Sequence, residues 1–110
     1  MWDSPQGEEL LWERLENGQG KTYQTAKGLS YTYVIRGKTL YFSRKDKPIT
    51  RSSVMVAFHR ALEVQKEAGC VKGPKTLQTF GASYLYPVFL ELGVCTARPE
   101  AEGPQQVRNL

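Results

Sequence analysis

The sequence predicts an α+β fold, in a small single domain with the element order α-β-β-α-α. Residues 29–43 alternate apolar and polar side chains in two runs around a glycine, which is typical of a β-hairpin. Segments 51–68 and 83–92 carry apolar residues at helical spacing. A chain of 110 residues with 40% hydrophobic residues has material for one core and not for two. We therefore expect a two-stranded antiparallel hairpin packed on helices.

The first element is a helix, expected over about residues 5–16. Ser4 suits the cap position and Pro5 suits the first helical position. Leu11 and Leu15 share one face, and an asparagine–glycine pair follows the last turn. The helix is too short to be stable alone, so this apolar face must dock on the rest of the domain.

The hairpin predicted over 29–43 follows a polar, irregular segment over 18–28. Gly37 marks the turn, and a two-residue loop at 36–37 or at 37–38 fits the pattern. Both loops leave the same apolar residues on one face, which we expect to be buried against helices. This face consists of Tyr31, Tyr33, Ile35, Leu40 and Phe42.

The longest helix is expected over 51–68, with Thr50 at its cap and an apolar stripe that includes Val54 and Phe58. The last helix is expected over 83–92, with Ser83 at its cap.

These elements give one compact domain over residues 1–95. The polar segment 96–110, which contains prolines and a glycine, is predicted to be a disordered tail.

No enzyme site, metal or cofactor is expected. Cys70 and Cys95 form neither a CxxC pair nor a disulfide framework, and with His59 they fall short of the four ligands of a structural zinc site. His59 is predicted on the exposed side of its helix, without a catalytic partner. Gly20–Thr22 matches the end of a phosphate-binding loop, but the first glycine of that motif would fall on Leu15.

Positive charge is concentrated in the middle of the chain. Residues 1–20 carry five acids against Arg14, a net charge of −4. Residues 21–75 carry twelve Lys and Arg against three acids, a net charge of +9, and residues 76–110 carry −1. The sum is the overall +4. Such clustering indicates an anionic partner.

The basic residues flank the hairpin tip, follow its second strand, open the long helix and occupy the connector after it. Arg51 lies in a first helical turn, where free backbone N–H groups and hydroxyls suit a phosphate. Tyr23, Tyr31 or Tyr41 would add stacking to single-stranded nucleic acid. The predicted nucleic-acid-binding residues are Arg36, Lys38, Arg44, Lys45, Lys47, Arg51, Lys72 and Lys75.

These residues predict a non-enzymatic nucleic-acid-binding accessory or regulatory protein, with DNA favoured over RNA as its partner. The alternative is a small protein-binding inhibitor or adaptor from a phage or mobile element, which docks on an acidic partner such as a nucleic-acid enzyme. In that case an exposed Trp2 or Trp12 would supply a second contact. The structural alternative is that Lys and Arg only solvate a hairpin edge.

A homodimer is a further hypothesis, because the first and last helices carry more apolar surface than two strands obviously cover.

The expected location is the cytoplasm, without a membrane partner. No stretch approaches the roughly 20 apolar residues that span a bilayer. The N-terminal residues lack the basic and then apolar pattern of a secretory signal.

Overall fold

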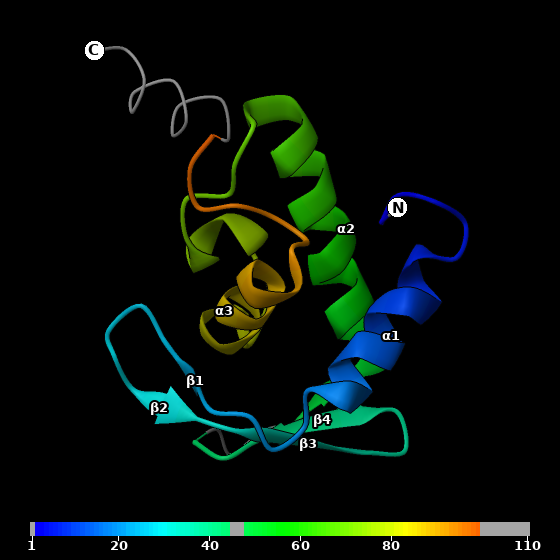
Figure 1. The fold of residues 1–110 in the computed structure, drawn as a ribbon, viewed down its shortest axis with the longest axis vertical. Coiled ribbons are helices and arrows are strands. Elements are labelled where there is room, and N and C mark those ends of the chain that lie inside the picture. The colour runs from blue at the N-terminus through cyan, green and yellow to red at the C-terminus, as the bar shows by residue number, and fades with distance from the viewer. Residues whose placement is uncertain (1, 45–47, 100–110) are drawn as a thin grey trace.

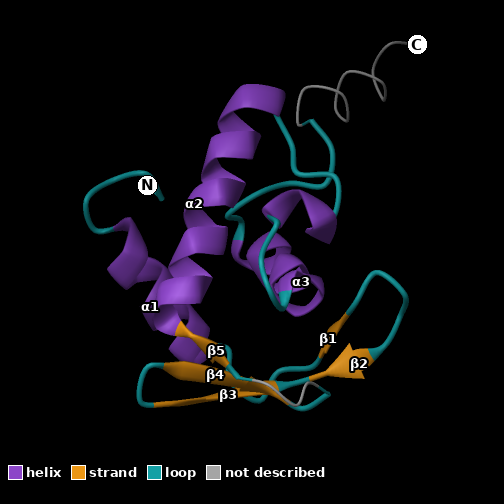
Figure 2. Cartoon of the chain, turned by 180° about the vertical axis from the view of Figure 1, so that it is seen from behind, coloured by secondary structure: helices purple, strands orange, loops and turns teal. Residues whose placement is uncertain are grey.

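A computed structural model, which describes residues 2–44 and 48–99, confirms the α+β class and the predicted order of elements. In this part of the chain the helices lie on one side of a layer of short strands (Figure 1, and from behind in Figure 2). The helices are α1 (Gly7–Asn17), α2 (Arg51–Ala68) and α3 (Ala82–Leu92), with a 3-10 turn η1 (Pro74–Leu77). The strands are β1 (Tyr23–Gln24), β2 (Ser30–Tyr31), β3 (Tyr33–Arg36), β4 (Thr39–Phe42) and β5 (Ile49–Thr50).

The predicted hairpin is formed by β3 and β4. Ile35 lies opposite Leu40, and Arg36 lies opposite Thr39, so the loop at 37–38 forms. Gly37 has φ +62°, a backbone conformation that glycine adopts without steric cost. The face predicted to be buried does face the helices: its side chains are buried, except that of Ile35, which is half-buried.

The β layer has more strands than the sequence predicted. β5 pairs antiparallel with β4, and β1 pairs antiparallel with β2 in a second small sheet. The additional strand β1 lies within the segment 18–28 that was expected to be irregular. Both β1 and β5 are two residues long, which is too short for an alternating pattern to be recognised in the sequence.

Helix α1 begins at Gly7, two residues later than predicted. Ser4 does not hold the predicted cap position, and its carbonyl oxygen accepts the N–H of Gly7. Gln6 occupies the cap position and makes no side-chain cap bond. A Cβ on Gly7 would lie 1.9 Å from the carbonyl oxygen of Trp2. The N-terminal segment therefore crosses the start of the helix at a distance that only glycine allows.

Helix α2 has the predicted bounds, and its cap is confirmed. The Thr50 hydroxyl oxygen accepts the N–H of Ser53 at 3.3 Å, and Gly69 ends the helix with φ +81°. Helix α3 begins one residue earlier than predicted, because Gly81 and not Ser83 occupies the cap position. Gly81 has φ +79°, a conformation that the preceding turn requires and that a serine adopts only with strain.

Trp2 closes the core instead of lying exposed, which corrects the expectation that it supplies a protein contact. Its side chain is 9% exposed and packs edge-on against Phe58, with ring centroids 5.9 Å apart. Its indole Nε1–H donates to the carbonyl oxygen of Gly93 at 3.1 Å. One residue thus ties the N-terminal segment to α2 and to the end of α3.

The apolar faces of the first and last helices are covered within one chain. Leu11 and Leu15 of α1 and Leu85 and Phe89 of α3 have no exposed surface. These four residues belong to a core shared with α2 and the strands, and the homodimer stays a hypothesis.

The start of the predicted tail is tied to the fold. The N–H of Thr96 donates to Oε1 of Gln65 at 2.9 Å, and its carbonyl oxygen accepts the N–H of Val71. The rest of the segment, from residue 100, lies outside the described residues.

Buried tyrosines join the β layer to the helices through hydroxyl groups. Tyr31 donates to the carbonyl oxygen of Tyr84 and Tyr33 to that of Leu15, each at 2.6 Å. Burial raises the pKa of the Tyr31 and Tyr33 hydroxyls well above the ordinary value of 10. The neutral form is favoured because a phenolate would lose its hydration and could no longer donate to a carbonyl.

We expect the protein to lose stability in alkaline solution. A raised folded-state pKa means that the unfolded chain releases these protons first, so stability falls as the pH rises above about 10. Tyr31 and Tyr33 each contribute a slope of up to about 1.4 kcal/mol per pH unit. Urea denaturation followed by circular dichroism at several pH values measures the slope.

The matched control is the double variant Tyr31→Phe/Tyr33→Phe, which cannot ionise at these positions. It should be less stable at neutral pH but lose less stability above pH 10. Equal slopes for both proteins would contradict the assignment.

Candidate nucleic-acid interface

Three of the predicted basic residues lie along the backbone where the hairpin turns and α2 begins. Arg36 and Lys38 flank the turn between β3 and β4. Arg51 joins them because its backbone N–H donates to the carbonyl oxygen of Lys38 at 2.8 Å. Strand β5 pairs with β4 and leads directly into α2, so it brings the backbone of Arg51 beside that of Lys38. We call Arg36, Lys38 and Arg51 the tip cluster.

A hollow of about 340 Å³ lies beside the tip cluster. The first N–H groups of a helix have no partner within it. In α2, the N–H of Arg51 is taken by Lys38 and that of Ser53 by Thr50. The N–H of Ser52, between them, has no acceptor among the described residues and remains for an anion. The hollow is lined by Lys38, Thr39, Thr50, Arg51 and Ser52.

The arginines of the tip cluster are held by aromatic rings. The guanidinium of Arg51 lies 5.5 Å from the ring centroid of Trp12, so it links α2 to α1. The guanidinium of Arg36 lies 5.7 Å from the ring centroid of Tyr41. Stacking positions a guanidinium while leaving its N–H edge available to an anion, because the ring occupies only one face. The sequence could not indicate the Arg51–Trp12 contact, since 39 residues separate the two.

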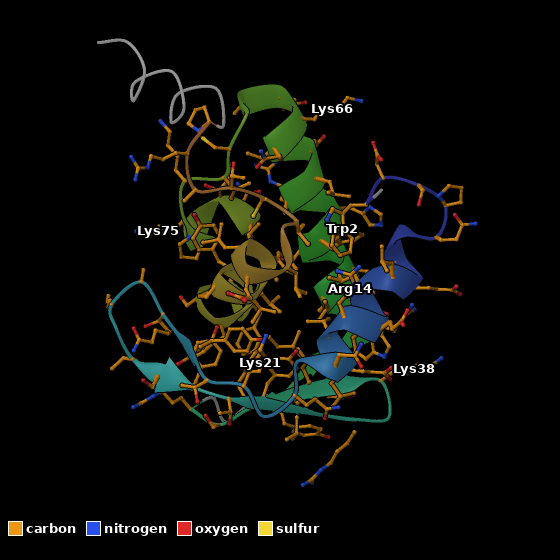
Figure 3. All side chains as sticks on the ribbon, in the orientation of Figure 1. Trp2, Arg14, Lys21, Lys38, Lys66 and Lys75 are labelled. Carbon is orange, nitrogen blue, oxygen red and sulfur yellow. The ribbon has the colours of Figure 1, made fainter. Side chains whose placement is uncertain are left out.

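The other predicted residues lie elsewhere. Arg44 is at the opposite end of the hairpin, where its Nε–H donates to the carbonyl oxygen of Ser30 in β2. Lys72 lines a separate hollow with the C-terminal end of α2. Lys75 belongs to η1, and Figure 3 shows it on the opposite side of the molecule from Lys38. The remaining two, Lys45 and Lys47, lie outside the described residues. The predicted residues therefore do not form a single surface within the described part.

The segment that contains β1 to β4 carries positive but no negative side chains. A net charge summed over a longer segment does not reveal this. Residues 17–45, which include β1 to β4, contain no aspartate or glutamate. The exposed acids Glu9, Glu13 and Glu16 belong to α1, a helix that lies on one side of the layer (Figure 1). The exposed Arg36 of β3 therefore has no carboxylate beside it on β3 or β4.

Residues that might carry chemistry are engaged in other ways. His59 is exposed as predicted, and its Nε2 lies 2.6 Å from Oε2 of Glu8, a contact that joins α2 to α1. Cys70 and Cys95 are buried free thiols. Burial raises the pKa of Cys95 to about 11, so this thiol is neutral and a poor nucleophile near pH 7.

No three His, Cys, Asp or Glu side chains are grouped as metal ligands within residues 2–44 and 48–99. No helix in these ranges combines the length and the apolar character needed to cross a bilayer.

Comparison of the chain with protein-family models, curated proteins and solved structures gives no match. Any functional assignment therefore depends on the geometry of the chain itself.

Proposed function

We propose that this chain is a non-enzymatic nucleic-acid-binding accessory or regulatory protein that holds phosphate groups at the tip cluster. The observation that carries the proposal is the hollow in which Lys38 and Arg51 meet the N-terminus of α2. A lysine, an arginine, hydroxyl groups and a free backbone N–H all favour a phosphate oxygen.

The charge of the surrounding surface supports a polyanion over a single small anion. Arg36 adds a third cation opposite Thr39, a residue that lines the hollow, and β3 and β4 contain no acid. A row of phosphates can use several cations at once, and binding then gains from counterion release.

The alternative of a protein-binding adaptor has less support from the geometry. Trp2 is buried, and Trp12 is half-buried beneath the guanidinium of Arg51. The second contact that this hypothesis assigned to an exposed Trp2 or Trp12 is therefore not supported.

The double variant Arg36→Ala/Lys38→Ala should bind nucleic acid about 10- to 50-fold more weakly near 0.1 M salt, because two phosphate contacts are lost. The slope of log affinity against log salt should become shallower by roughly 1.4 to 1.8. Electrophoretic shift assays over a salt series, with single-stranded and duplex DNA and RNA, measure both quantities. Arg51 stays unchanged, since its stacking on Trp12 also stabilises the fold.

The matched control is Lys72→Ala/Lys75→Ala, which removes the same charge from residues away from the tip. This variant should keep both the affinity and the salt slope within about twofold. Equal losses in the two double variants would show that general charge, and not the tip cluster, is responsible. The absence of a shift with any nucleic acid at low salt would overturn the proposal.

A further inference from the structure

One face of the three-stranded sheet is turned away from the helices. Along β3 and β4 the side chains alternate, so one set packs into the core and the other set points outward. The strand register places Val34 beside Tyr41, Arg36 beside Thr39, and Thr39 beside Thr50. We call this set the outer face. It consists of Val34, Arg36, Thr39, Tyr41 and Thr50.

The outer face presents an aromatic ring to solvent. Tyr41 is 40% exposed and Val34, beside it, is 41% exposed. The other tyrosines considered for stacking, Tyr23 and Tyr31, are buried and cannot receive a base. Tyr41 is thus the residue of that group with an accessible ring. Arg36 lies diagonally across from it and holds a cation 5.7 Å from the ring centroid.

The outer face is continuous with the hollow at the tip. Thr39 and Thr50, which are paired across β4 and β5, belong to the outer face and also line the hollow. Tyr41 lies two residues from Thr39 along β4, a separation of about 7 Å at ~3.4 Å per residue. One short stretch of a single strand would therefore reach both the hollow and the ring of Tyr41.

We infer that the tip cluster binds single-stranded nucleic acid, which lies along the outer face with a phosphate in the hollow and a base stacked on Tyr41. The inference rests on the proposed function and specifies its ligand. A base in a duplex is stacked between its neighbours, so its face is not available to stack on a tyrosine such as Tyr41 in the middle of β4. An unpaired base can, and such stacking tolerates any base. Arg36 is positioned to contact the adjacent phosphate.

The experiment compares Tyr41→Ala with Tyr41→Phe. Probes are labelled oligothymidylate and oligouridylate of about 12 nucleotides, together with a duplex of equal length, measured by fluorescence anisotropy at fixed salt. The wild-type protein should bind single strands more tightly than the duplex. Tyr41→Ala should weaken single-strand binding about 5- to 150-fold, since each stacked base contributes about 1–3 kcal/mol. Tyr41→Phe keeps the ring and should remain within about twofold.

Each other outcome has a definite meaning. If the duplex is bound as well as a single strand and Tyr41→Ala is neutral, the inference is overturned while the proposed function stands. If Tyr41→Phe weakens binding as much as Tyr41→Ala, the ring does not stack and the inference is likewise overturned. If neither probe class binds, the inference and the proposed function both fail. Thermal unfolding of each variant checks the fold, which an exposed side chain should leave intact.

Discussion

Replacement of Gly7 by alanine should destabilise the protein by about 2–4 kcal/mol, although alanine is the better helix former. The added Cβ would lie 1.9 Å from the carbonyl oxygen of Trp2, so the N-terminal segment must move. Trp2 then loses its packing on Phe58 and its hydrogen bond to Gly93. A loss of that kind amounts to most of a tryptophan-to-alanine change, offset by about 1 kcal/mol of helix propensity.

Two measurements separate this mechanism from a general defect. Urea denaturation gives the change in stability, and tryptophan emission in a Trp12→Phe background reports Trp2 alone, which should shift to longer wavelength. The control is Gly73→Ala, at a position with φ −170° and no atom within 4 Å of the added Cβ. The control should be nearly neutral. A Gly7→Ala protein as stable as the wild type would refute the close contact.

Replacement of Phe58 by alanine should cost about 3–5 kcal/mol and lower the melting temperature by roughly 15–30 °C. Phe58 has no exposed surface, and its ring packs edge-on against Trp2 and Phe89. The cavity would lie where α2 meets the N-terminal segment and α3. Since the free energy of unfolding of small domains is only about 5–15 kcal/mol, this substitution would remove a large part of it.

The matched control is Val56→Ala, on the same helix two residues earlier. Val56 is 64% exposed, so its truncation should change stability by less than about 0.5 kcal/mol. Calorimetry of the two variants and the wild type provides the comparison. Similar melting temperatures for Phe58→Ala and Val56→Ala would contradict the burial of Phe58.

The elements with long, regular patterns could be predicted from the sequence. Helix α2 has the predicted bounds because three signals agree: a polar cap, apolar residues at helical spacing, and a glycine after the last turn of the 18-residue helix. The β3–β4 hairpin follows in the same way from the alternation over 29–43, although residues 30–31 pair with β1 in the second sheet. The start of α1 could not be predicted, because Ser4 and Pro5 suit a helix locally, while the path of the segment before Gly7 is set by tertiary contacts of Trp2 with Phe58 and Gly93.

The candidate site was only partly accessible to sequence reasoning. Arg36 and Lys38 follow directly from the hairpin turn, and Arg51 from the helix cap. What could not be predicted is that β5 brings Arg51 beside Lys38, since a strand of two residues leaves no pattern. Arg44 and Lys75 were grouped with them by charge and by their positions along the chain, which do not determine their positions in space.

The hydrogen bond from Trp2 to Gly93 spans 91 residues, so it sets an order in time as well as in space. During synthesis at about 5–20 residues per second, the N-terminal segment waits roughly 5–20 s before its acceptor has been made. Until then Trp2 and the apolar side of the first helix have no complete surface on which to dock. Contacts between such distant residues also slow folding of the finished chain, because the loop entropy is lost before the contact stabilises the structure. The residue that closes the core is thus synthesised well before its hydrogen-bond partner, and it is among the last that can reach its place.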